Sequence, residues 1–158
     1  MTAGEQRDKM KWDELGPYLD LSQRLLTLEA GDRRGAEDVV EAAELVCGKL
    51  RQHLGRRIGP AGFESLLARA LHLSKRRFPF LDEVGPGGRD GDCLKGARGS
   101  LVGHDSNEVR EGLVTVIANL LWLLGRFIGY DMALRQVARL WSQVPIWDIG
   151  SGPKETSE

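Results

Sequence analysis

The chain has 158 residues, of which 41% are hydrophobic and 28% charged, and its formal net charge is −1. This length and composition predict one globular domain with its own core. The near-zero net charge excludes proteins that depend on a global field to bind nucleic acid or membranes, so such a partner would need a local patch. Two cysteines, and an N-terminus without an apolar signal region, predict a cytoplasmic protein without obligatory disulfides.

The first part of the chain offers little apolar periodicity. Residues 1–18 predict a flexible, extended segment, and the single helical domain is expected to cover residues 19–149. Within it, Leu19–Leu28 can form a short amphipathic helix. The stripe of that helix would consist of Leu21, Leu25 and Leu28.

Apolar residues at three- and four-residue steps between residues 36 and 54 predict one buried face of an α-helix. They are Ala36, Val39, Val40, Ala43, Val46, Cys47, Leu50 and Leu54. Three acids, Glu37, Glu41 and Glu44, fall on the opposite face, which we expect to be solvated.

A glycine and a proline then punctuate the pattern. Gly59 suits a helix end and Pro60 suits the first turn of a new helix, which we expect to end near Phe78. The inner face of this second helix would carry Phe63, Leu66, Leu67, Ala70, Leu71 and Ser74. Residues 34–79 therefore predict a helix–turn–helix half.

A segment rich in glycine and charge, residues 85–105, comes next and predicts a mobile linker without core residues. Its Cys93 is expected to be exposed, whereas Cys47 is expected to be a core thiol. A disulfide between the two is possible, although nothing in the sequence requires it.

The second half, residues 106–145, repeats the plan of the first. Ser106 or Asn107 can cap a helix that ends at Gly129, and Asp131 can cap the last helix. The inner residues of that last helix would be Leu134, Val137, Leu140 and Trp141. The polar tail, residues 150–158, predicts disorder.

An internal similarity connects the two halves. The run Leu54–Gly59 recurs as Leu124–Gly129, with five of six residues identical at an offset of 70 positions. Chance could produce this, because leucine, glycine and arginine are abundant here. Duplication is favoured, and it predicts an all-α fold: a four-helix bundle made of two duplicated helix–turn–helix halves, plus a short N-terminal helix.

Sequence motifs for catalysis are lacking. The chain has no HExxH, no CxxC and no GxSxG motif, and its three histidines are not expected to converge. Several linker residues could gather around a metal ion, but their spacing matches no known ligand pattern. These are Asp90, Asp92, Cys93, His104 and Asp105. The sequence therefore predicts a non-enzymatic protein with no metal and no cofactor.

Residues 51–77 carry seven basic residues against the single acid Glu64. Helix C-termini attract cations, so a solvated surface explains much of this excess. The alternative is phosphate binding by the basic side chains. Its candidate residues are Arg56, Arg57, Arg69, Lys75, Arg76 and Arg77.

The helix after residue 106 is apolar on nearly every face. Its uncharged run Gly112–Gly125 spans about 21 Å, too short for a bilayer core of roughly 30 Å, which favours a buried helix and no membrane partner. Such a helix must be covered all round, either by its own chain or by a partner. The candidate partner-binding residues are Leu121, Trp122, Leu123, Phe127 and Trp147.

These observations predict a helical interaction module, an adaptor or regulatory subunit that forms homo-oligomers or docks a larger protein. The excess of arginine over lysine, 16 to 6, is typical of a GC-rich bacterial genome, so we expect a bacterial partner. The alternative is a nucleic-acid-associated subunit that binds phosphate through the basic residues of the 51–77 stretch.

Overall fold

A computed structural model describes residues 3–87, 91–101 and 103–142, with the side chains of the first helix described from Glu14 onward. The helices are α1 (Ala3–Ala30), α2 (Ala36–Lys75), the short α3 (Ala97–Ser100), α4 (Ser106–Ile128) and α5 (Tyr130–Leu140). A 3₁₀ turn, η1 (Pro79–Glu83), precedes a two-strand ribbon in which β1 (Gly85–Pro86) pairs antiparallel with β2 (Leu94–Lys95). The predicted all-α class is confirmed.

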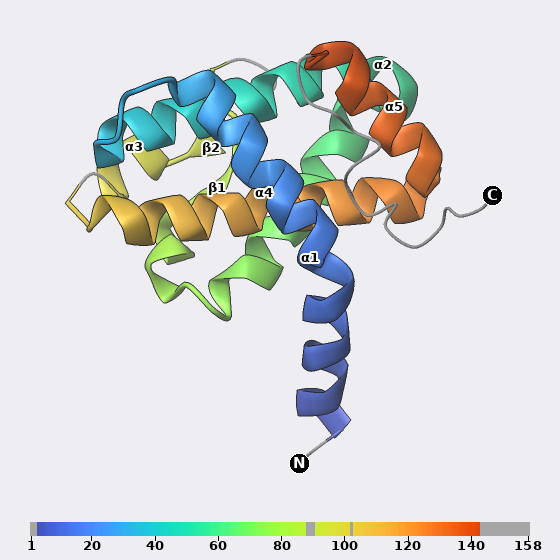
Figure 1. The fold of residues 1–158 in the computed structure, drawn as a ribbon, viewed down its shortest axis with the longest axis horizontal. Coiled ribbons are helices and arrows are strands. Elements are labelled where there is room, and N and C mark those ends of the chain that lie inside the picture. Colours follow the sequence, from blue (N-terminus) through green and yellow to red (C-terminus); the bar gives the residue numbers. More distant parts are fainter. Residues whose placement is uncertain (1–2, 88–90, 102, 143–158) are drawn as a thin grey trace.

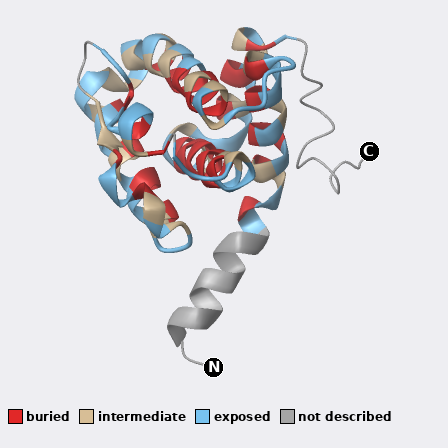
Figure 2. Cartoon of the chain, turned by 90° about the vertical axis from the view of Figure 1, so that its left-hand side faces the viewer, coloured by how far each residue is buried: buried red, intermediate tan, exposed pale blue. Residues whose placement is uncertain are grey.

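The core lies around α4, which packs mainly against α2 and α1 (Figure 1). Its side chains are buried on every face, as Figure 2 shows for the helix at the centre of the molecule. The burial expected for α4 is confirmed, and so is the stripe expected in the first arm of α2, where Val46, Cys47 and Leu50 have no exposed surface. Apolar residues at helical spacing therefore identified most of the core.

By length and composition, α4 could also cross a bilayer, and it is the only such helix in the part of the chain that the structure describes. Of its most apolar 18-residue window, 72% is buried inside the protein. Core helices of soluble proteins can have the same length and composition.

The N-terminal expectation was wrong, because α1 begins at Ala3 and continues through Pro17 to Ala30. Its buried face includes Leu15 and Tyr18. Two apolar residues in the predicted flexible segment are too few to show a periodic stripe. Leu21 and Leu25 are buried as expected, but Leu28 is 43% exposed. Figure 1 shows α1 crossing over α4, so this helix supplies much of the cover that α4 needs.

Two glycines bend the helices where the sequence placed helix ends. Gly59 interrupts α2 with φ 80° and ψ 155°, and Gly129 separates α4 from α5 with φ 99° and ψ 142°. This region of backbone space is open essentially to glycine alone. Figure 1 shows α5 rising steeply from the end of α4 instead of lying antiparallel along it.

The predicted caps were wrong. Asp105, one residue before the two candidates, caps α4, and its Oδ2 accepts a hydrogen bond from the Glu108 N–H at 3.2 Å. For α5 the N-cap is Gly129 itself, so Asp131 lies in the first turn and does not cap the helix. Aspartate is among the preferred N-cap residues, so the choice between neighbouring candidates depends on the chain's path.

The segment expected to be a mobile linker contributes to the core. Its residues Cys93, Leu94, Ala97 and Leu101 are each at most 1% exposed. Cys93 is therefore buried, not exposed as predicted, while Cys47 is a core thiol as expected. Of this segment, residues 88–90 and 102 lie outside the described part, as does the predicted disordered tail.

Glu44 explains how the linker attaches to α2, and its predicted solvated position was wrong. The residue is only 8% exposed. Its Oε1 accepts a hydrogen bond from the Cys93 N–H at 2.7 Å, and its Oε2 accepts one from the Leu94 N–H at 2.8 Å. One carboxylate thus satisfies two consecutive amides of a buried segment.

Candidate functional site

The candidate site is a cavity of about 570 Å³ between the turn that joins α1 to α2 and the N-terminus of α4. Three arginines line it, the neighbours Arg33 and Arg34 together with the distant Arg110, so we call it the arginine cavity. Its polar lining comes mainly from Thr27, Arg33, Arg34, Ser106, Asn107 and Arg110. The lining contains no carboxylate, histidine or thiol.

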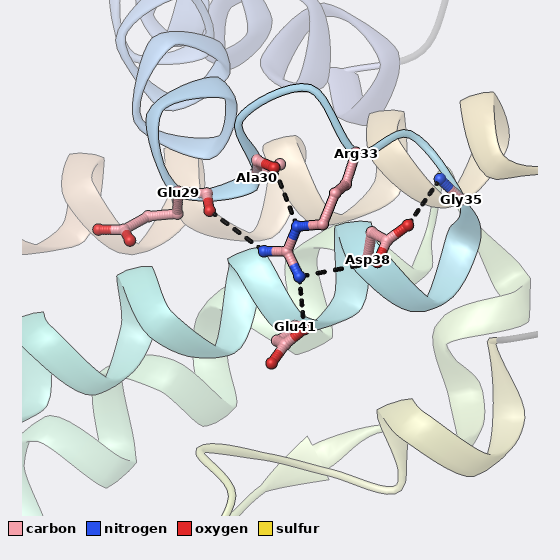
Figure 3. A network of polar contacts seen from close by, with 6 residues as sticks. All are labelled: Glu29, Ala30, Arg33, Gly35, Asp38 and Glu41. Atoms are coloured by element: carbon pink, nitrogen blue, oxygen red, sulfur yellow. Dashed lines mark hydrogen bonds and ion pairs between the residues drawn. The ribbon is translucent and has the colours of Figure 1, made fainter.

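Arg33 has a structural role in this wall (Figure 3). Its Nη1 lies 3.0 Å from Oε1 of Glu41 and 3.8 Å from Oδ1 of Asp38. Its Nε donates to the carbonyl of Ala30 at 3.2 Å. The guanidinium thus ties the end of α1 to the first turns of α2, and its charge is already compensated by two carboxylates.

Arg110 projects from the second turn of α4 and is anchored by neutral groups on α1. Its Nη2 donates to Oγ1 of Thr27 at 2.5 Å. When the amide of Gln23 is turned so that its oxygen faces the guanidinium, that oxygen accepts from Nε at 2.7 Å and from Nη2 at 3.0 Å. A guanidinium has five N–H donors, so these contacts leave donors that can bind a ligand.

Arg34 places a second positive charge next to Arg110. Burial and the charge of Arg34 both lower the pKa of Arg110 from its ordinary value. The guanidinium still stays protonated at neutral pH, because the ordinary pKa of arginine lies far above neutrality. Two like charges facing one hollow repel each other, so an anion between them would be bound favourably.

The N-terminus of α4 adds to the positive potential. The first N–H groups of an α-helix have no partner within the helix, and the helix dipole places partial positive charge there. Ser106 and Asn107 supply these groups at the cavity wall. Asp105 already accepts from the N–H of Glu108, so the two preceding amides are the ones that an anion could reach.

The expected partner-binding residues are largely covered by the chain itself. Leu121 is 1% exposed and Leu123 is 8% exposed, so the chain itself covers these two side chains. Trp122 is half-buried, and its indole N–H donates to Oε1 of Glu14 on α1 at 3.2 Å. Of the four that the structure describes, Phe127 alone is largely exposed, at 64%. Trp147 lies outside the described residues.

The basic residues predicted to bind phosphate do not gather in one place. Arg56 and Arg57 lie before the bend of α2, whereas Arg69, Lys75, Arg76 and Arg77 lie along or just after its second arm. The sixteen residues of that arm separate its two ends by about 24 Å. The arginines that do converge, Arg34 and Arg110, were missed because they are 76 positions apart in the sequence.

The histidines are also dispersed. His53 lies 2.6 Å from the amide oxygen of Gln136, while His104 stacks near Phe80 with ring centroids 5.2 Å apart. His72 is exposed on the second arm of α2. In the described ranges, no three histidine, cysteine or acidic residues are grouped so that they could hold a metal ion.

Comparison with known proteins gives no relative: no family model, no curated protein and no solved structure matches the chain.

Proposed function

We propose that this chain is a non-enzymatic helical module, a regulatory subunit that binds a small phosphate monoester in the arginine cavity. The observation that carries the proposal is the pairing of Arg34 with Arg110 in a hollow whose lining holds no acid. A phosphate monoester carries up to two negative charges and several acceptor oxygens, which suit two guanidiniums and a helix N-terminus. The volume of about 570 Å³ leaves room for an organic group beyond the phosphate.

A binding role is favoured over catalysis because of what the lining contains. General acid–base and nucleophilic catalysis need a histidine, carboxylate, thiol or similar group within hydrogen-bond reach of the reacting atoms. The titratable residues of this lining are arginines, which stay protonated. They can hold and orient an anion but cannot exchange a proton with it at neutral pH.

The first test measures thermal unfolding with inorganic phosphate and, separately, with a nucleoside 5′-monophosphate, both at constant ionic strength. A ligand that binds only the folded chain raises Tm as its concentration exceeds Kd. We expect both to raise Tm, and a stronger effect of the nucleotide would show that the organic group binds as well. Removing one charge-assisted contact, in Arg34→Gln or Arg110→Gln, should weaken binding about tenfold or more.

Arg56→Gln/Arg57→Gln is the matched control, because both arginines are exposed and lie outside the cavity. It should respond to both ligands as the original chain does. Equal Tm shifts in the control and in Arg34→Gln, or no shift in the original chain, would contradict the proposal. Loss of binding in the control alone would favour the nucleic-acid alternative, which an oligonucleotide gel shift at about 50 mM salt would then examine.

A second candidate function is self-association, and the exposure of Phe127 favours it. This ring is 64% exposed at the corner where α4 meets α5, next to Tyr130, which is 38% exposed. Aromatic side chains of this kind are common anchors of protein interfaces. We expect sedimentation velocity to show a dimer of the original chain and a monomer of Phe127→Ser. A monomer at all concentrations would exclude this candidate.

We also propose that the two halves arose by duplication. The support is that the first arm of α2 and the helix α4 are each followed by a bend glycine, Gly59 and Gly129, at the same offset of 70 positions as the sequence similarity. Homologous chains should then carry glycine at both bends, with halves that resemble each other. Homologues that lack both glycines would contradict the duplication.

A further inference from the structure

A second cavity, of about 590 Å³, lies on the inner side of the α2 bend. Phe63 and Leu67 from the second arm of α2 supply apolar wall, and Gly48 and Arg51 come from the first arm. Cys93 contributes to the same wall from the segment before β2. This second cavity is separate from the arginine cavity, so its chemistry does not depend on the proposed function.

Cys93 and Cys47 are both buried in the core, although 46 positions separate them in the sequence. Glu44 lies three residues before Cys47 on α2, so its contact with the Cys93 main chain places Cys93 beside the turn that carries Cys47. The main chain of Cys93 is fixed on both sides: its N–H donates to Oε1 of Glu44 at 2.7 Å, and its carbonyl accepts from the N–H of Gly87 at 2.7 Å. These bonds fix the main chain of Cys93 next to the turn of α2 that carries Cys47.

The two thiols differ in acidity. The hydrogen bond in which the Cys47 S–H donates to Cys93 lowers the pKa of Cys93, and the charge of Arg51 lowers it further, against the opposing effects of burial, Glu44 and Asp92. The same hydrogen bond, together with complete burial, raises the pKa of Cys47 well above its ordinary value. Cys93 is therefore the thiol that ionises first, and it is the one at the cavity wall.

We propose that Cys93 and Cys47 are a reversible dithiol–disulfide pair that a small hydroperoxide oxidises through the cavity. Cys93 is only 1% exposed, so the oxidant must be small, such as hydrogen peroxide, and a bulky disulfide such as oxidised glutathione is too large to reach the sulfur. A thiolate is the reactive form towards both oxidants. The pairing of a cavity-wall thiol with a buried second thiol provides both the attacking and the resolving group.

The reaction proceeds in two steps. The Cys93 thiolate attacks one peroxide oxygen, the O–O bond breaks, and the products are Cys93 sulfenic acid and a hydroxide that takes up the thiol proton as water. The Cys47 sulfur then attacks the Cys93 sulfur, the S–O bond breaks, and the hydroxyl leaves with the Cys47 proton as a second water. Overall, two thiols and one hydrogen peroxide give one disulfide and two waters.

The experiment uses the full chain, reduced and freed of reductant, with stoichiometric hydrogen peroxide. Intact mass spectrometry should show the loss of two hydrogens, and peptide mapping should show Cys47 linked to Cys93, reversibly with dithiothreitol. Cys47→Ala should stop at a sulfenic acid that dimedone traps, while Cys93→Ala should react at least tenfold more slowly. Oxidised glutathione at the same concentration should leave both thiols unmodified.

Three results would overturn the proposal. One is over-oxidation of Cys93 to the sulfinic acid in the original chain without any disulfide. Another is equal reaction rates for Cys93→Ala and the original chain. The third is a mixed disulfide with glutathione that forms as fast as the internal disulfide. The measurements on the original chain decide the question even if a variant fails to fold.

Discussion

Replacing Glu44 with alanine should lower the free energy of unfolding by about 2–5 kcal/mol, because the change leaves two buried amides without an acceptor. The amides are those of Cys93 and Leu94, whose N–H groups donate hydrogen bonds to the Glu44 carboxylate oxygens at 2.7 and 2.8 Å. Urea denaturation of the two proteins gives the difference directly. Because the same bonds position Cys93, Glu44→Ala should also slow the formation of the Cys47–Cys93 disulfide.

Glu37→Ala is the matched control, because Glu37 lies on the same helix but is exposed in its first turn. Its loss removes only a favourable charge near the helix N-terminus, with an expected cost below about 1 kcal/mol. Equal destabilisation by the two substitutions would show that the Glu44 contacts contribute nothing of their own.

The pH dependence of stability gives an independent readout on Glu44. Burial raises the pKa of Glu44, with a further rise from the charge of Asp92, and these effects outweigh the hydrogen bonds from Leu94 and Cys93. A folded pKa above the unfolded value of about 4.3 means that the folded chain holds this proton more tightly. The stability that this tighter proton binding contributes is fully present below the unfolded pKa and is lost as pH rises through the folded pKa. Stability measured relative to Glu44→Gln, which cannot titrate, should therefore fall over that range.

Periodicity predicted the helices whose buried faces are long and continuous. The apolar stretch of α4 and the stripe in the first arm of α2 extend over about twenty residues each, so both exceed the local noise of the sequence. The bends at Gly59 and Gly129 were located for a local reason as well, since only glycine tolerates those backbone angles. The directions of the helices after each bend could not be predicted, because tertiary packing sets those directions.

The helix α1 and the linker were misinterpreted for a different reason. In α1, Leu15 and Tyr18 are buried within a stretch whose composition is polar and includes Gly16 and Pro17. In the linker, Leu94 and Leu101 are buried without any visible helical or strand period, because β2 and α3 are only two and four residues long. In both segments, contacts with elements distant in the sequence determine which residues are buried, and a local sequence pattern carries no information about such contacts.

The candidate site could not be read from charge density along the chain. The sequence showed a run of basic residues in 51–77, but a helix distributes such residues around its surface and along its length. The arginine cavity instead combines Arg34 from one turn with Arg110 from another helix and amides from its N-terminus. The only local signal was the Arg33-Arg34 pair, and Arg33 is used to join α1 to α2.

Gly96→Ala should destabilise the chain by about 2–5 kcal/mol, the sum of a positive-φ cost and a steric one. Gly96 has φ 89°, and a Cβ atom there would lie 2.4 Å from the main-chain oxygen of Glu83. Because Glu83 ends η1, the clash would separate this turn from the segment that carries Cys93 and Leu94. Urea denaturation measures the loss.

Gly99→Ala provides the comparison three residues away, in α3, where a Cβ would meet nothing within 4 Å. Alanine is the better helix former and restricts the unfolded chain, so this substitution should be neutral or stabilise by up to about 1 kcal/mol. The opposite signs of the two effects are expected only if residues 91–101 are packed against the helices. If both substitutions were neutral, the segment would be the mobile linker that its composition suggested, and the Cys47–Cys93 contact would have no fixed geometry.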